Sequence, residues 1–212
     1  MSKSMRQGVE ARFAQEMQDF WLYFRTFLRC KADVASIAPS SRATARAMLR
    51  GLEALSSGVV VELGAGTGAI TSELLGNIGG SCETIIVERD HEFFNRLRER
   101  FPGTQIVEGD ALDFDRLLDE RNISQVDHVL CELPLNWLVP NQRDRLLNAV
   151  CRRLKPEGSF RQLSHAIWRP RPTLCRYFQD VSLQLVWRNL PPAGCFICRQ
   201  PRVTAADDRQ SC

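Results

Sequence analysis

A glycine-rich loop after a short apolar run constrains this chain more than any other stretch. Residues 59–61 are all valine and follow Ser56-Ser57-Gly58, which predicts a short buried parallel strand. Gly64, Gly66 and Gly68 follow at alternate positions and predict a tight turn that opens a helix. Glycine is needed because a side chain would keep the backbone away from whatever lies across the strand end. Doubly wound α/β folds present a ligand in this way, at the carboxyl end of the first strand.

Two similar motifs do not match this loop. A dinucleotide fingerprint requires glycine at position 69, where the chain has Ala69, and the Gly-Lys-Ser/Thr of a phosphate-binding P-loop is absent. What remains is Glu-Leu-Gly-x-Gly-x-Gly, with Glu62 two residues before the first glycine. It resembles the first motif of class I S-adenosylmethionine (SAM)-dependent methyltransferases. On this motif alone, another nucleotide-binding fold and a structural glycine turn stay open as alternatives.

Three further strand-and-loop units support the resemblance. Residues 84–87 form a second apolar run that ends in Glu88, and an acidic residue there is suited to hold a ribose hydroxyl pair. Residues 105–109 lead into Asp110-Ala111, which the resemblance places at the adenine, and residues 126–130 lead into the segment 131–137. The cofactor-binding residues that we expect are Glu62, Gly64, Gly66, Gly68, Glu88, Asp110, Ala111 and Leu133.

Length and composition favour one domain. The chain has 212 residues, 44% of them hydrophobic, which is enough for one α/β domain with a sizeable core. No apolar stretch approaches about eighteen residues and no signal-peptide core is present, so we expect a soluble or peripheral protein. The eight cysteines are scattered, and the C-x-x-C at 195–198 lies in a strand-like run that points its thiols to opposite faces. We therefore expect buried, reduced cysteines in the cytosol and no metal site.

The segment before the glycine loop predicts two helices. In residues 8–30, apolar residues recur at three- and four-residue steps beside basic ones, a pattern typical of a helix that lies in a membrane interface. The alternative is a helix that covers the core of the catalytic domain. Residues 42–53 predict a second helix, capped by Ser40 or Ser41. Its N-terminus, with Ser40, Ser41 and Arg42, would bind an anion, either the carboxylate of SAM or a substrate phosphate.

The rest of the chain alternates between helices and strands. The predicted helices are 68–75, 91–101, 113–120 and 141–154. A turn at 155–158 leads into a strand at 159–163, and the prolines at 170–172 break the chain. Residues 182–188 and 195–199 predict the antiparallel pair that closes such a sheet. The predicted organisation is a membrane-associating helix over 1–33, a methyltransferase domain over 34–202 and a disordered tail over 203–212.

Three stretches narrow the resemblance to one subfamily. Residues 27–46, 133–135 and 186–193 resemble bacterial phospholipid N-methyltransferases of the soluble, membrane-associated type. The resemblance implies a Rossmann-like α/β fold: a mainly parallel seven-stranded sheet with helices on both faces and an N-terminal amphipathic helix. It implies a monomer at the cytoplasmic side of an anionic membrane that methylates phosphatidylethanolamine towards phosphatidylcholine. Related members act on ornithine lipids. Cys131-Glu132 departs from the small residues expected there, so Glu132 would alter which amine is accepted.

Two other readings are weaker. The loop at 132–135 also resembles the Asn-Leu-Pro-Tyr of rRNA adenine dimethyltransferases, but Glu132 and Leu135 replace the amide and the aromatic ring, which disfavours an RNA substrate. A SAM-binding protein without catalysis is disfavoured because this loop is intact in form.

Residues 151–202 hold ten Lys or Arg and two acidic residues, an excess that favours an anionic partner, either phospholipid or nucleic acid.

The chemistry suggests the remaining site residues. Methyl transfer from a sulfonium is an in-line displacement, so the protein must position the nucleophile and exclude water. The acceptor amine must first lose a proton, which Glu132 or His165 could take. Aromatic faces can stabilise the positive charges, and the candidates are Tyr23, Trp137 and Trp168. For the aromatic residues and His165, a purely structural role is the alternative.

Overall fold

The computed structural model describes residues 39–202 except 54, 166, 168 and 188–191; the side chains of residues 39–41 are also outside the description. Its strands are β1 (Ser57–Leu63), β2 (Ser81–Glu88), β3 (Gln105–Glu108), β4 (Val126–Cys131), β5 (Leu154–Ser164), β6 (Phe178–Val186) and β7 (Ala193–Pro201). Its helices are α2 (Pro39–Leu49), α3 (Ala69–Asn77), α4 (His91–Arg100), α5 (Phe114–Asp119), α6 (Pro140–Arg153) and α7 (Pro170–Tyr177), with short 3₁₀ turns η1 (Ala111–Asp113) and η2 (Leu135–Trp137).

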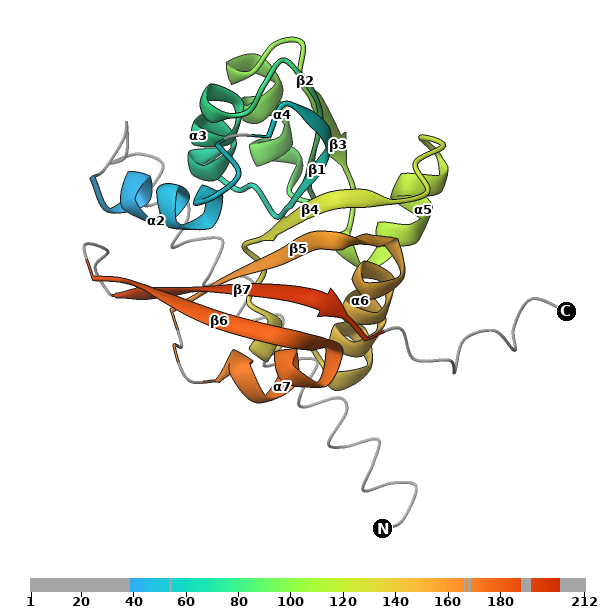
Figure 1. Cartoon of the computed structure of the whole chain (residues 1–212). Helices are drawn as coiled ribbons and strands as arrows, with labels where there is room; N and C mark the ends of the chain where they lie inside the picture. Colours follow the sequence, from blue (N-terminus) through green and yellow to red (C-terminus); the bar gives the residue numbers. More distant parts are fainter. Residues whose placement is uncertain (1–38, 54, 166, 168, 188–191, 203–212) are drawn as a thin grey trace, which may run out of the picture.

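The strands form one seven-stranded sheet in the order β3-β2-β1-β4-β5-β7-β6 (Figure 1). β1 to β5 are parallel, and β7 runs antiparallel between β5 and β6. The chain order reverses between β1 and β4, and ligands of open α/β sheets bind at such a point, outside the carboxyl ends of the strands. The predicted seven-stranded sheet, including the closing antiparallel pair, is confirmed, whereas the predicted N-terminal helix lies outside the described residues. The site must therefore lie where β1 and β4 end.

Two apolar clusters pack on opposite faces of the sheet, which is why its central strands are buried on both sides. On one face, Val61 and Leu63 of β1 pack with residues of α5, α6 and α7. On the other face, Val60 packs with residues of α2, α3 and α4. Figure 1 shows α2 and α3 on one side of the sheet and α5 and α6 on the other. Because helices cover both faces of the sheet, a ligand site is expected at the carboxyl ends of the strands.

Three local predictions were wrong, each for a physical reason. Residues 155–158 belong to β5 and not to a turn before it; the β4–β5 register slips there, from Val126 opposite Leu154 to His128 opposite Ser159, as in a bulge. The prolines at 170–172 do not break the chain but begin α7, because proline is tolerated in the first helical turn. Helix α2 spans Pro39–Leu49 and not 42–53, so Ser40 and Ser41 lie in its first turn and do not precede it as caps. Gly51 follows the helix with φ +81°, which suits a helix C-terminus.

The C-x-x-C cysteines lie on opposite faces of β7, as predicted. Cys195 packs in the cluster beneath α2 and Cys198 in the cluster beneath α6 and α7, and burial raises the pKa of Cys195 to about 12. Within the described residues, no group of three or more His, Cys, Asp or Glu could hold a metal ion. In the same part of the chain, no helix is long and apolar enough to cross a membrane.

Candidate active site

The glycine loop after β1 is built for close approach to its neighbours. Gly64, Gly66 and Gly68 have φ of 79°, 53° and 74°, in the left-handed region that favours glycine. A Cβ on Gly64 would lie 2.8 Å from Cδ2 of Leu133, in the loop after β4, and one on Gly68 would lie 2.7 Å from Cδ2 of Leu97 in α4. The loop therefore packs directly against the loop after β4, where two strand ends meet.

Glu88 ends β2 beside this loop. Its side chain is 8% exposed, and its Oε2 accepts a hydrogen bond from the Gly66 amide at 2.8 Å while its Oε1 accepts one from the Asp90 amide at 2.8 Å. Burial raises the pKa of Glu88, and the backbone hydrogen bonds act in the opposite direction. A carboxylate has about four acceptor positions, more than these backbone amides use, so Glu88 keeps acceptor capacity for a ribose hydroxyl. This arrangement fits the role predicted for Glu88.

Asp110 and Ala111 follow β3, next to Glu88. The Gly109 amide donates to the Glu88 carbonyl at 3.0 Å, which ties this loop to the end of β2. Asp110 caps η1 by accepting from the Leu112 amide at 2.9 Å, and Ala111 is 5% exposed. The structure therefore places both residues at the expected strand end. Their contact with adenine stays a prediction.

Glu62 and Glu132 bring two carboxyl groups together at the ends of β1 and β4. Glu62 has no exposed surface, and its Oε2 accepts from Oγ1 of Thr71 in α3 at 2.9 Å. Glu132 follows β4 directly, and its amide donates to the Leu63 carbonyl at 3.1 Å. The two residues stand on neighbouring strand ends, and the two side chains lie close enough for each to act on the pKa of the other. Burial raises the pKa of Glu62 to about 7, and burial followed by the charge of Glu62 raises the pKa of Glu132 well above its ordinary value.

Gln162 holds the loop after β4 and was missed in the sequence. It lies on β5, is 1% exposed, and its Nε2 donates to the carbonyls of Leu133 at 2.8 Å and Leu163 at 2.6 Å. These two bonds fix the orientation of the amide, because the reverse orientation would point its oxygen at two carbonyl oxygens. The sequence feature that could have identified Gln162 as a site residue was its position near the end of the predicted fifth strand.

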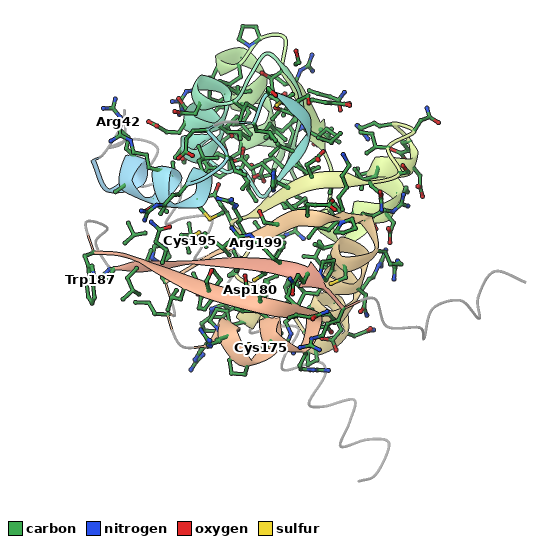
Figure 2. The ribbon with its side chains drawn as sticks, viewed as in Figure 1. Arg42, Cys175, Asp180, Trp187, Cys195 and Arg199 are labelled. Atoms are coloured by element: carbon green, nitrogen blue, oxygen red, sulfur yellow. The ribbon has the colours of Figure 1, made fainter. Side chains whose placement is uncertain are left out.

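The other predicted site residues are exposed or lie outside the described residues. Trp137 lies in η2 and is 46% exposed, and His165 is an exposed residue just beyond β5, so it is not a buried base. Arg42 is exposed in the first half of α2, as Figure 2 shows. Tyr23, Trp168 and the side chains of Ser40 and Ser41 lie outside the described residues, as do the predicted N-terminal helix over 1–33 and the tail over 203–212.

Known proteins resemble this chain in both sequence and fold. A family described as "Methyltransferase domain" matches residues 60–158. An ornithine lipid N-methyltransferase from Singulisphaera acidiphila is 37% identical over 186 residues, which cover 86% of this chain and 97% of that protein. The N-methyltransferase NodS from Bradyrhizobium japonicum, in complex with S-adenosylhomocysteine, is similar with a TM-score of 0.61 and 16% identity, over 79% of this chain and 90% of that one. A 1,6-didemethyltoxoflavin-N1-methyltransferase from Burkholderia thailandensis gives 0.62 and 16%, over 87% and 90%.

The sheet order, the glycine loop and the acidic strand ends define a Rossmann-like methyltransferase domain. The chain belongs to the SAM-dependent methyltransferases. It is an enzyme, and its methyl donor is SAM. The residues present fit this cofactor, because Glu88 lies against the glycine loop and keeps acceptor capacity for a ribose hydroxyl.

Proposed function

We propose that this enzyme is an N-methyltransferase that methylates the head-group amine of an amine lipid, with ornithine lipid as the first candidate. The observation that carries the proposal is the 37% identity to an ornithine lipid N-methyltransferase over 97% of that protein. The sequence alone placed phosphatidylethanolamine first and ornithine lipid as an alternative. The named relative favours the alternative. An RNA acceptor stays a weaker hypothesis, because Glu132 and Leu135 replace the amide and the aromatic ring that such enzymes carry.

At the carboxyl edge of the sheet, different residues serve cofactor binding and acceptor positioning. SAM, when bound, supplies a methyl group on a sulfonium centre. Glu88 and the glycine loop would hold its nucleoside, and the loop after β4, which Gln162 holds in place, would form the wall on the acceptor side. An ammonium has no free electron pair, so the acceptor side also needs a group that takes a proton.

Exposed apolar side chains support a lipid surface as the partner. Trp187, just beyond β6, is 72% exposed, and Leu185 is 39% exposed. Leu185 pairs with Gly194 of β7, which pairs with Ser164 at the end of β5, so these side chains lie at the same edge as the site. Tryptophan suits a membrane interface because its ring is apolar and its N–H is polar. Figure 2 shows Trp187 on the same side of the molecule as Arg42. A peripheral location at the cytoplasmic face of a membrane is part of this proposal.

The basic excess of residues 151–202 contributes less to this proposal than the sequence indicates. Among the described residues, at least five of these cations make contacts within the fold. Arg152 and Arg153 pair with Asp115, and Lys155 pairs with Asp127 at 2.9 Å. Arg161 is buried and Arg199 lies 3.6 Å from Asp180. The exposed tryptophan at the edge of the site is therefore the better support for a lipid partner.

Transfer of labelled methyl groups from SAM tests the proposal. The purified enzyme is given vesicles that contain ornithine lipid, vesicles that contain phosphatidylethanolamine, vesicles without an amine lipid, and RNA. We expect label in ornithine lipid in preference to phosphatidylethanolamine, and none in the other two. Glu88→Gln should lose both SAM binding and label. Label in RNA, or no label in any lipid despite SAM binding, would overturn the proposal.

A further inference from the structure

We propose that Glu62 and Glu132 act together as one proton-accepting site: the pair holds one proton between its carboxyl groups and takes a second from the head-group ammonium. This inference rests on the proposed function, because it assigns the proton acceptor that an amine substrate requires. It adds Glu62, which the sequence places only at the cofactor, to the acceptor side of the site. Glu132 is, with Cys131, where this chain departs from the family that it resembles.

The contact between the two side chains requires a shared proton. A carboxylate only accepts hydrogen bonds, so two carboxylates cannot bond to each other unless one carries a proton. The Oε1 atoms of Glu62 and Glu132 are both buried, and no donor among the described residues reaches either of them. Thr71 satisfies only the Oε2 of Glu62. A proton between the two carboxyl groups explains both the contact and the missing donors.

Among the described residues, the surroundings leave the pair with a net negative charge and without a cationic partner. Glu88 of β2 adds a further negative charge that acts on both residues. The buried cation on β5, Arg161, donates instead to the carbonyls of Met48 and Arg50. Between described residues, no ion pair joins a lysine or arginine to Glu62 or Glu132. A buried charge needs a partner, so the site favours a cationic ligand.

The proton balance of the step suits this environment. The N–H bond of the ammonium breaks, its electron pair stays on nitrogen, and an O–H bond forms on the ionised carboxyl group. The pair then carries two protons and no charge, which is the form that burial favours. The acceptor nitrogen is left neutral with the free pair that a nucleophile needs. The extra proton returns to water before a further round, so the same pair can serve each methylation of an amine that still carries a proton.

The test uses the full chain with Glu62→Gln and Glu132→Gln, which keep the side-chain size and remove one titrating group each. Carbon-13 NMR of glutamate labelled at the carboxyl carbon should show two buried groups in the wild type that titrate as a coupled pair. Each variant should leave a single buried group at this position, with a changed midpoint. SAM affinity, measured by calorimetry, should stay within about threefold for Glu132→Gln, a free-energy change of less than about 1 kcal/mol. Glu83→Gln, an exposed change near the start of β2, is the matched control.

Kinetics completes the test. In the wild type, kcat/KM should fall as the pH drops through the titration of the pair, because a doubly protonated pair cannot accept a proton. In Glu132→Gln, kcat should fall by about 100-fold, the contribution typical of a general base. Independent titration of the two groups in the acid range, or an unchanged rate and pH profile in Glu132→Gln, would overturn the inference. If the wild type methylates no amine lipid, the proposed function fails, and the NMR titration separates that failure from a wrong assignment of the shared proton.

Discussion

Glu62 is completely buried, although its side chain is ionisable. Burial raises its pKa from 4.5 to about 7, so the folded protein binds a proton at this residue over a pH range in which the unfolded chain has released it. The stability that comes from this group is fully present below about pH 4.5 and is lost as the pH rises through about 7. An ionisable group in this position is a cost to folding that a catalytic role would explain.

Glu62→Gln should therefore stabilise the protein in a pH-dependent way. We expect its melting temperature to exceed that of the wild type at about pH 8 and the difference to shrink as the pH falls to about 5. Thermal unfolding across this range measures the difference, with the exposed Glu83→Gln as control. A difference that does not change with pH would show that Glu62 is not held in a protonated form by burial.

Gly68 provides a second test, because its conformation and its surroundings both exclude a side chain. Its φ is +74°, and an added Cβ would meet Leu97 at 2.7 Å and Phe101 at 2.8 Å. Gly68→Ala should lower the free energy of unfolding by about 2–4 kcal/mol. Gly76 in α3 has no atom within 4 Å of an added Cβ, so Gly76→Ala should instead raise it by about 0.5–1 kcal/mol. Urea unfolding compares the two, and equal effects would contradict this packing of the loop.

The sequence predicted the site residues that belong to local motifs, but not the contact between Glu62 and Glu132. Glu62 and Glu88 were found because each lies in the last two residues of a strand, within a recognisable motif. The contact between Glu62 and Glu132 depends on the β1–β4 register, which places Leu63 beside Cys131, and no local pattern encodes a register between distant strands. Gln162 was missed because a glutamine in a strand has no signature until its partners, the carbonyls of Leu133 and Leu163, are known.

A buried cation on β5 hydrogen-bonds to the C-terminal end of helix α2, in addition to the apolar packing of that helix on the sheet. Arg161 of β5 is 2% exposed, and its Nη1 donates to the carbonyls of Met48 and Arg50 at 2.8 Å each. Its Nε donates to Ser159 Oγ at 3.0 Å, which also bonds to Nδ1 of His128 at 2.9 Å. Carbonyls at a helix C-terminus attract a positive charge, so this contact needs no carboxylate. The end of α2 is thereby fixed above β5.

Arg161→Met should release this end of α2. The change leaves two carbonyls without their donor, and we expect a loss of about 3 kcal/mol in the free energy of unfolding, because each unsatisfied buried group costs about 1–3 kcal/mol. Chemical denaturation measures the loss, and Arg171→Met on the exposed side of α7 is the control. A loss below about 1 kcal/mol would mean that water replaces the guanidinium without difficulty.

Periodicity predicted the existence of most helices and strands but not their ends. The apolar runs that became β1, β2 and β4 were clear because both faces of these strands are buried. Helix α7 was missed because Pro170 and Pro172 indicate a break, although they only require that a helix start there. The bulge at 155–158 looked like a turn because Pro156 and Gly158 occur in both.

Across the whole molecule, the two ends of the sheet differ in their surfaces. The β6 end carries Leu185 and Trp187, exposed at the edge where the site lies. The β3 end is packed against α4, whose Phe94 is partly exposed and lies beneath the Arg98 guanidinium. An exposed tryptophan at one end of the sheet and a partly exposed phenylalanine at the other allow the two ends to be compared.

Trp187→Ser should weaken binding to anionic vesicles, because the indole leaves water when it enters the interface. We expect a reduction of about tenfold in the partition coefficient, equal to about 1.4 kcal/mol. Phe94→Ser should leave the partition coefficient unchanged, and neither change should alter SAM affinity. Co-sedimentation with vesicles and calorimetry measure the two quantities. Equal losses in both variants would contradict docking through the β6 end.

The most direct test of amine-lipid methylation is mass spectrometry of lipids from cells that make both ornithine lipid and phosphatidylethanolamine. The cells produce either the wild-type chain or Glu88→Gln, which should not bind SAM. We predict that ornithine lipid gains methyl groups only with the wild type, and to a greater extent than phosphatidylethanolamine. Unchanged masses of both lipids, in cells whose wild-type protein is folded and binds SAM, would contradict the proposed function.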